Sequence, residues 1–224
     1  MAHETRIFLV THGKSAFRPI DDRIGDLAES QHGVVARKQL LTLGLGRGAI
    51  EDRIARGQLR RVHWGVYAVG HRPMTPESRL MAAVLAGGRD AVLSHRSAGP
   101  LWGILPLMSI APEVTRPTRC ESRPGMRIHC GLLKPDEVTR LTGIPVTSAP
   151  RTVLDIAALS STAQLEKALN ELEVRGITDA LSIPDLLDRH PRKRGSSSSD
   201  PSLPMSARSG GSLGKSWRPG FRHF

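Results

Sequence analysis

The stretch that decides the fold is HGVVARKQLLTLGLGRGAIEDRIARGQLRRVHWGVYAVG, residues 32–70. It predicts two short helices, over 36–43 and from 46 to about 56, because apolar residues recur there at helical spacing and a glycine follows each run. Over 59–69, apolar and polar residues alternate around a central glycine, which is typical of a β-hairpin. Two helices joined by a short glycine-containing turn and followed by a hairpin indicate a winged helix-turn-helix.

Upstream of this stretch, the spacing of apolar residues predicts a further helix with Asp21 or Asp22 as its N-cap. His32-Gly33 is expected to end this helix, and Val34-Val35 is interpreted as a short apolar link to the next one. Residues 1–21 have no clear period. They are interpreted as a flexible leader, the alternative being a start codon assigned too early.

Downstream, residues 76–190 predict a compact α/β domain, because strands and helices alternate along the chain. Helices are expected over 76–86, 95–102, 150–158, 162–175 and 183–190, and strands over 91–93, 113–116, 126–129, 138–141 and 144–147. Residues 191–224 are rich in Ser, Gly, Pro and Arg and predict a disordered basic tail. The expected fold class is therefore α/β (α+β), with the winged helix-turn-helix over 22–70 placed before the α/β domain.

The formal net charge of +11 favours a nucleic-acid partner. Much of the excess lies in residues 191–224, where seven basic residues face one acidic residue, whereas 22–70 holds eight basic and five acidic residues. No apolar stretch has the length of a transmembrane helix, and no signal peptide is recognisable. A cytoplasmic protein is expected, in which Cys120 and Cys130 are buried or idle thiols, the alternative being a single disulfide.

Candidate DNA contacts follow from the way helix-turn-helix proteins use the start of their second helix to meet base edges. Arg47 is expected to contact a base, and Arg53 and Arg56 to contact phosphates. Further candidates at the start of the preceding helix and on the hairpin are Arg37, Lys38, Arg60, Arg61 and His63. The alternative for each is a solvated surface charge, since Glu51 and Asp52 offset the arginines.

Successive side chains of a strand point to opposite faces of the sheet. Trp64 and Tyr67 are three positions apart, so they are expected on opposite faces of the hairpin, with one of the two in the core. Trp64 shares its face with Val62 and Val66.

No complete active site is recognisable in the sequence. Ser94 and His95 suggest a nucleophile pair, but adjacent residues on a helix do not face each other, so Ser94 is interpreted as a helix cap. Arg151 and Asp155, four residues apart on a helix, predict an internal salt bridge, the alternative being a contact with a partner. Because no group of residues has metal-ligand spacing, we expect no catalytic residue, no metal and no cofactor.

Several stretches together resemble the AbiEi-type antitoxins. Those similar to the family's N-terminal winged-helix domain are His32-Gly33-Val34-Val35, Leu45, Ile50, Gly57-Gln58-Leu59 and 62–70. Those similar to the rest of its longer members are 92–98, Leu101-Trp102-Gly103, 144–147 and 151–155. The resemblance covers about residues 22–190.

The resemblance implies a winged helix that binds double-stranded operator DNA and represses its own operon in a type IV toxin–antitoxin system. It implies a nucleotidyltransferase-like toxin as partner, and residues 76–190 are expected to mediate that contact or a homodimer. Long relatives also carry a C-terminal endonuclease domain of the very-short-patch-repair type. After His190 this sequence departs from that pattern, so no nuclease activity is expected. The alternatives are a truncated relative of such endonuclease fusions and a protein-interaction module.

Overall fold

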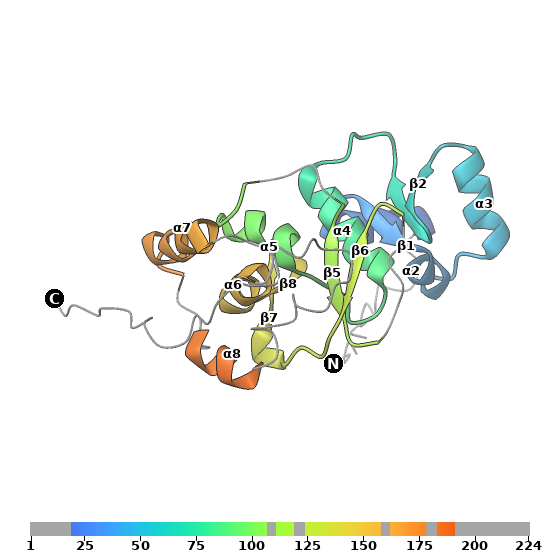
Figure 1. Ribbon diagram of the computed structural model, residues 1–224. Coiled ribbons are helices and arrows are strands. Elements are labelled where there is room, and N and C mark those ends of the chain that lie inside the picture. The colour runs from blue at the N-terminus through green and yellow to red at the C-terminus, as the bar shows by residue number, and fades with distance from the viewer. Residues whose placement is uncertain (1–18, 107–110, 119–123, 158–161, 178–182, 191–224) are drawn as a thin grey trace, which may run out of the picture.

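The computed structural model describes residues 19–106, 111–118, 124–157, 162–177 and 183–190 (Figure 1). The predicted tail over 191–224, and all but the last residues of the predicted leader, lie outside this range. The described chain contains two sheets, one of three strands and one of five, which confirms a mixed α/β fold. Among the residues described, every helix is too short or too polar to span a lipid bilayer.

The N-terminal part has the element order of a winged helix. Its elements are α1 (Ile20–Ser30), β1 (Val34–Ala36), α2 (Arg37–Thr42), α3 (Arg47–Ala55), β2 (Leu59–His63) and β3 (Val66–Val69). Its three strands are antiparallel in the order β1-β3-β2. The predicted helices α2 and α3 and the predicted hairpin are confirmed. Two glycines allow the turns after α2 and α3, since Gly44 has φ +95° and Gly57 has φ +75°.

Two local predictions in this part are wrong. Val34-Val35 is a strand rather than a link, because both side chains are fully buried and Val34 pairs with Ala68 of β3. The N-cap of α1 is Pro19 rather than an aspartate. Asp21 and Asp22 lie instead in the first turn of α1, where their charge favours the positive end of the helix dipole.

The hairpin buries Tyr67 and exposes Trp64. Tyr67 is 1% exposed in the core, whereas Trp64 is 79% exposed. Trp64 and Gly65 lie between β2 and β3, and Gly65 has φ +70°. Because this turn ends the strands, the alternation that places Val62 and Val66 on a buried face does not extend to Trp64.

The second part contains the predicted elements, with boundaries shifted by at most one residue. They are α4 (Pro76–Gly87), β4 (Val92–Leu93), α5 (His95–Trp102), β5 (Glu113–Arg116), β6 (Arg127–Cys130), β7 (Val138–Leu141), β8 (Ile144–Thr147), α6 (Ala149–Ala157), α7 (Thr162–Val174) and α8 (Ile183–Arg189), with a short 3-10 helix at Pro135–Glu137. The strand order is β6-β5-β4-β8-β7, and the pairs β4–β8 and β5–β6 are parallel. Cys130 is exposed at the end of β6, and Cys120 lies outside the described residues.

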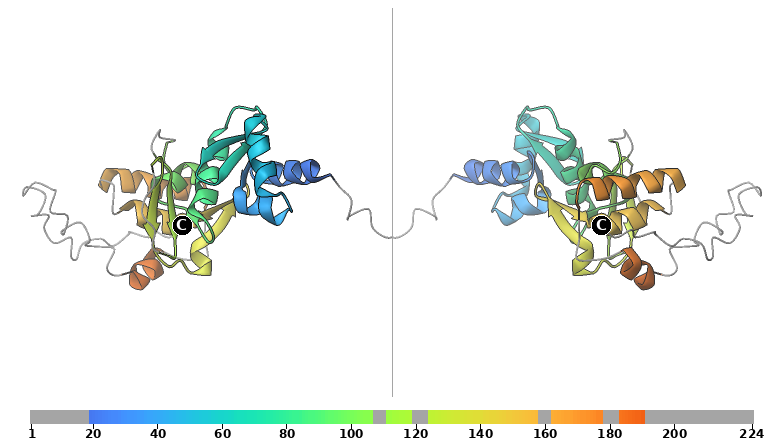
Figure 2. Two further views of the ribbon diagram at one scale, coloured as in Figure 1. Left: turned by 90° about the vertical axis from the view of Figure 1, so that its right-hand side faces the viewer. Right: turned by 90° about the vertical axis from the view of Figure 1, so that its left-hand side faces the viewer.

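Helix α4 joins the two sheets. One hydrophobic cluster contains Met81 and Val84 of α4, Val34 and Val66 of the small sheet, and Val146 of the large sheet. Polar contacts strengthen this junction, since the Ser78 hydroxyl donates to the His32 carbonyl at 2.6 Å. This hydrophobic cluster is shared by both sheets and holds the winged helix against the α/β domain. Figures 1 and 2 show α3 and α7 at well separated ends of the molecule.

Candidate nucleic-acid interface and a buried polar cluster

Helix α3 presents its first residue to solvent. Ile50 is fully buried and anchors the inner face of α3, while Arg47, Glu51 and Asp52 are exposed on the outer side. Arg47 directly follows the N-cap Gly46, so its side chain lies at the end of the helix that enters the groove in helix-turn-helix proteins. The geometry therefore suits the base contact expected of Arg47.

Arg37 connects three elements of the winged helix. Its guanidinium donates to the Glu51 carboxylate on α3 at 2.8 Å and to the Tyr67 hydroxyl at 3.0 Å. The hairpin of β2 and β3 is the wing of the winged helix, and Trp64-Gly65 is its turn. The backbone N–H of Arg37 donates to the carbonyl of Gly65 in this turn at 2.7 Å. The hydrogen bond to Glu51, followed by that to Tyr67, raises the pKa of Arg37. Arg37 thus links the turn between β2 and β3 to helix α3.

Arg53 holds α3 against α1. Its guanidinium forms an ion pair with Asp21 at 2.7 Å and also donates to the backbone carbonyl of Ala49 at 3.2 Å. The Arg53 side chain is 18% exposed. Its hydrogen-bonding capacity is therefore largely used within the domain.

The other predicted basic residues point into solvent. Lys38, Arg47, Arg56 and Arg61 are exposed, and within the described ranges none of them forms an ion pair. Arg60 is exposed as well and donates to the carbonyl of Arg72 at 3.4 Å. Exposed cations without internal partners are available to phosphates.

His63 and Trp64 give the wing a different chemistry. Burial lowers the pKa of His63, so its imidazole is neutral at pH 7 and offers hydrogen bonds rather than charge. Trp64, which sequence reasoning did not select as a site residue, is a large exposed aromatic next to these groups. Its position in a two-residue hairpin turn was the signal that could have identified it, because turn residues project from both faces of a sheet.

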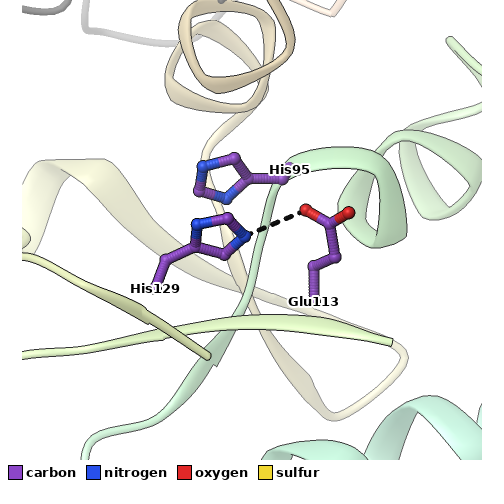
Figure 3. A group of neighbouring side chains, drawn as sticks. All are labelled: His95, Glu113 and His129. Atoms are coloured by element: carbon purple, nitrogen blue, oxygen red, sulfur yellow. Dashed lines mark hydrogen bonds and ion pairs between the residues drawn. The ribbon is translucent and has the colours of Figure 1, made fainter. Parts of the chain in front are cut away.

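A second group of functional side chains lies in the α/β domain (Figure 3). His95 begins α5, Glu113 begins β5 and His129 lies on β6. The His129 Nε2 atom is 3.0 Å from Glu113 Oε2, and the His95 and His129 rings stack with centroids 3.6 Å apart. Burial raises the pKa of Glu113, but hydrogen bonding to His129 and the nearby positive groups outweigh it, so the net pKa is lowered.

Ser94 occupies the N-cap position of α5, but its side chain does not cap the helix. The Ser94 hydroxyl instead accepts from Thr115 Oγ1 at 2.8 Å and lies 2.9 Å from His95 Nδ1. The predicted capping role is therefore wrong. The cause is the backbone of His95, whose φ of +52° is not helical and turns the imidazole back toward its neighbour.

This Ser–His contact does not make a nucleophilic site. Ser94 is fully buried, and Asp155 Oδ2 lies 3.9 Å from the same His95 nitrogen that faces Ser94. In a catalytic triad the serine and the carboxylate contact opposite nitrogens of the imidazole. The arrangement instead extends the polar group around His95.

The predicted pair of Arg151 and Asp155 is confirmed, with the guanidinium 3.0 Å from the carboxylate. Arg151 also forms an ion pair with Glu137, and His190 Nε2 lies 2.8 Å from the other Glu137 oxygen. Glu137 and Asp155 are 0% and 1% exposed. Sequence reasoning missed Glu137 and His190 because they come from the 3-10 helix and from the residue after α8.

Comparison with known proteins covers the N-terminal part. Residues 22–70 match the protein family described as "Transcriptional regulator, AbiEi antitoxin". The matched range extends from the first turn of α1 to the residue after β3, which is the winged helix. No curated protein matches the chain significantly.

Proposed function

We propose that this chain binds operator DNA through its winged helix, because residues 22–70 match the family model of the AbiEi antitoxin transcriptional regulators. The operator lies upstream of its own gene in a type IV toxin–antitoxin operon, which the protein represses. The observation that carries this proposal is the placement of Arg47, which is exposed at the N-terminus of α3. The protein acts as a regulator rather than as an enzyme.

The basic residues and the histidine of the interface have three roles. Arg47 reads a base edge in the major groove, where an arginine is best suited to guanine. The exposed Lys38, Arg56, Arg60 and Arg61 contact phosphates and set the register on the duplex. Arg37, Arg53 and His63 act mainly by position, since the two arginines hold α2, α3 and α1 together and His63 is uncharged. The acidic residues Glu51 and Asp52 limit the non-specific attraction of α3 for DNA.

The α/β domain provides the protein contacts in this proposal. Its helices α7 and α8 lie at the end of the molecule remote from α3 (Figure 1), so a protein partner bound there leaves α3 accessible to DNA. The expected partner is a nucleotidyltransferase-like toxin, and a second copy of the chain completes a dimer on DNA. Repression and toxin neutralisation both take place in the cytoplasm.

The test is a titration of the full chain against its own upstream DNA and against a scrambled duplex, at two salt concentrations. A specific repressor retains a gap of about 10³-fold or more between the two duplexes. Binding through the basic tail alone gives equal affinities that fall together as salt rises. Equal affinities for both duplexes would refute a specific repressor and favour a protein-interaction module. Metal-dependent cleavage of the DNA would favour a nuclease.

Trp64→Ala is expected to weaken operator binding by about 1 kcal/mol, or about fivefold, because an exposed indole in the wing buries apolar surface against sugars or a base step. The measurement is the operator titration above. Leu132→Ala is the matched control, since Leu132 is equally exposed at 79% but lies in the α/β domain. If the two variants bind equally well, Trp64 makes no DNA contact.

A further inference from the structure

The cluster of His95, Glu113 and His129 brings together one ligand-type atom from each of three separate elements. These three atoms all lie within 4.8 Å of one another. Two ligand atoms that share one zinc ion are at most about 4.2 Å apart, because each lies about 2.1 Å from the metal. The group is therefore within small side-chain movements of coordination distance.

The chemistry of the three donors selects a class of ion. Two imidazoles and one carboxylate suit Zn²⁺ and similar transition metals, whereas Mg²⁺ and Ca²⁺ prefer oxygen ligands alone. From these donors and their placement, we propose that His95, Glu113 and His129 form a binding site for a divalent transition-metal ion, with Zn²⁺ preferred.

The surroundings of His95 support a built site. His95 is a non-glycine residue with φ +52°, a conformation that costs free energy and is found at ligand-binding positions. Its Nδ1 atom is oriented by the hydroxyl of Ser94, which is itself held by Thr115. Metal sites use such outer hydrogen bonds to fix the orientation of their ligands.

The stacking of the rings defines what must move. The two ring planes are 11° from parallel, and imidazole lone pairs lie in the ring plane, so both rings cannot point to one ion while they are stacked (Figure 3). The His129 side chain is 26% exposed and lies on β6, an edge strand, whereas the His95 side chain is 11% exposed. Metal binding therefore turns the His129 ring, while His95 and Glu113 stay in place.

The resulting site has three protein ligands. His129, at 26%, has the most exposed side chain of the three, compared with 11% for His95 and 4% for Glu113. A metal held there ties the start of α5 to β5 and β6. This inference concerns the α/β domain and does not depend on DNA binding.

The experiment is a calorimetric titration of the chelator-treated full chain with ZnCl₂, and in parallel with MgCl₂. One equivalent of Zn²⁺ is expected to bind at micromolar or lower concentration, with no comparable binding of Mg²⁺. Glu113→Gln and His129→Gln are each expected to weaken Zn²⁺ binding by about 100-fold. His71→Gln is the matched control and leaves the affinity unchanged, because His71 is exposed and distant in sequence from the cluster.

Two further readouts separate a specific site from adventitious binding by surface histidines. Co²⁺ substituted into the site is expected to show the visible absorption of a low-coordinate ion, and this signal disappears in His129→Gln. Protons compete with Zn²⁺ for the imidazole nitrogens, so zinc affinity is also expected to fall as the pH is lowered. Thermal melting of the variants in chelator checks that they fold. Absence of a one-equivalent zinc transition, or full zinc affinity in both ligand variants, would overturn the proposal.

Discussion

Arg151→Ala is expected to destabilise the protein by about 3–5 kcal/mol, because it leaves two buried carboxylates without their cation. Arg151 is 2% exposed and contacts both Glu137 and Asp155. His190 remains beside Glu137, but the Asp155 oxygen that Arg151 engages loses this partner. The measurement is the free energy of unfolding from urea denaturation of the full chain.

Arg175→Ala is the matched control for this result. Arg175 and Glu171 form an ion pair of the same i, i+4 spacing, but their side chains are 50% and 37% exposed. A solvated pair contributes about 0.3–0.5 kcal/mol, so this variant should be nearly as stable as the wild type. Arg151→Met, which retains most of the buried volume, is expected to lose nearly as much stability as Arg151→Ala. A loss below about 1 kcal/mol in both Arg151 variants would show that the buried pairs do not hold the domain together.

Arg47→Ala is expected to weaken operator binding by about 1–3 kcal/mol, or roughly 5- to 150-fold, and to relax the preference for the operator over scrambled DNA. The reason is that Arg47 lies at the N-terminus of α3, where side chains reach base edges. Its exposure means that the substitution should leave the melting temperature unchanged. The measurement is the operator titration with both duplexes.

Two other arginine variants separate base reading from simple charge loss. Arg56→Ala also removes one exposed cation, at the C-cap of α3. Because Arg56 is expected to contact a phosphate, this variant should bind both duplexes more weakly by the same factor. It should also reduce the slope of log affinity against log salt concentration by about one. Arg175→Ala removes a cation directly after α7, a helix that lies at the opposite end of the molecule from α3 (Figure 1), and should leave both affinities unchanged. Operator selectivity that survives in Arg47→Ala would place sequence reading elsewhere on the winged helix.

Operator binding by the winged helix and zinc binding by the α/β domain are separable properties. The DNA titration of His129→Gln is expected to match that of the wild type in the presence of chelator, because His129 lies on β6 and Arg47 on α3. Loss of DNA binding in Arg47→Ala with normal zinc binding would complete the separation.

The winged helix was predictable because its signals are local. Glycines after α2 and α3, apolar residues at helical spacing and the alternation along the hairpin act over a few residues each. The exposure of Arg47 at the start of α3 followed from the same pattern, since the helix buries Ile50 on its other side. Local propensity and burial pattern agreed at these positions, so the sequence alone was sufficient.

Only the tertiary structure decided the partners of the buried and paired groups. Strand β1 is too short to show a pattern, and it becomes a strand by pairing with β3, more than thirty residues later. Arg53 pairs with Asp21 because α1 packs beside α3, and Glu113 meets His129 because β5 and β6 are parallel neighbours. The Ser94–His95 contact occurs together with a left-handed backbone angle at His95, which the flanking sequence does not indicate. Spacing along the chain determines each element, but the approach of side chains from distant elements is set by how the sheets and helices pack.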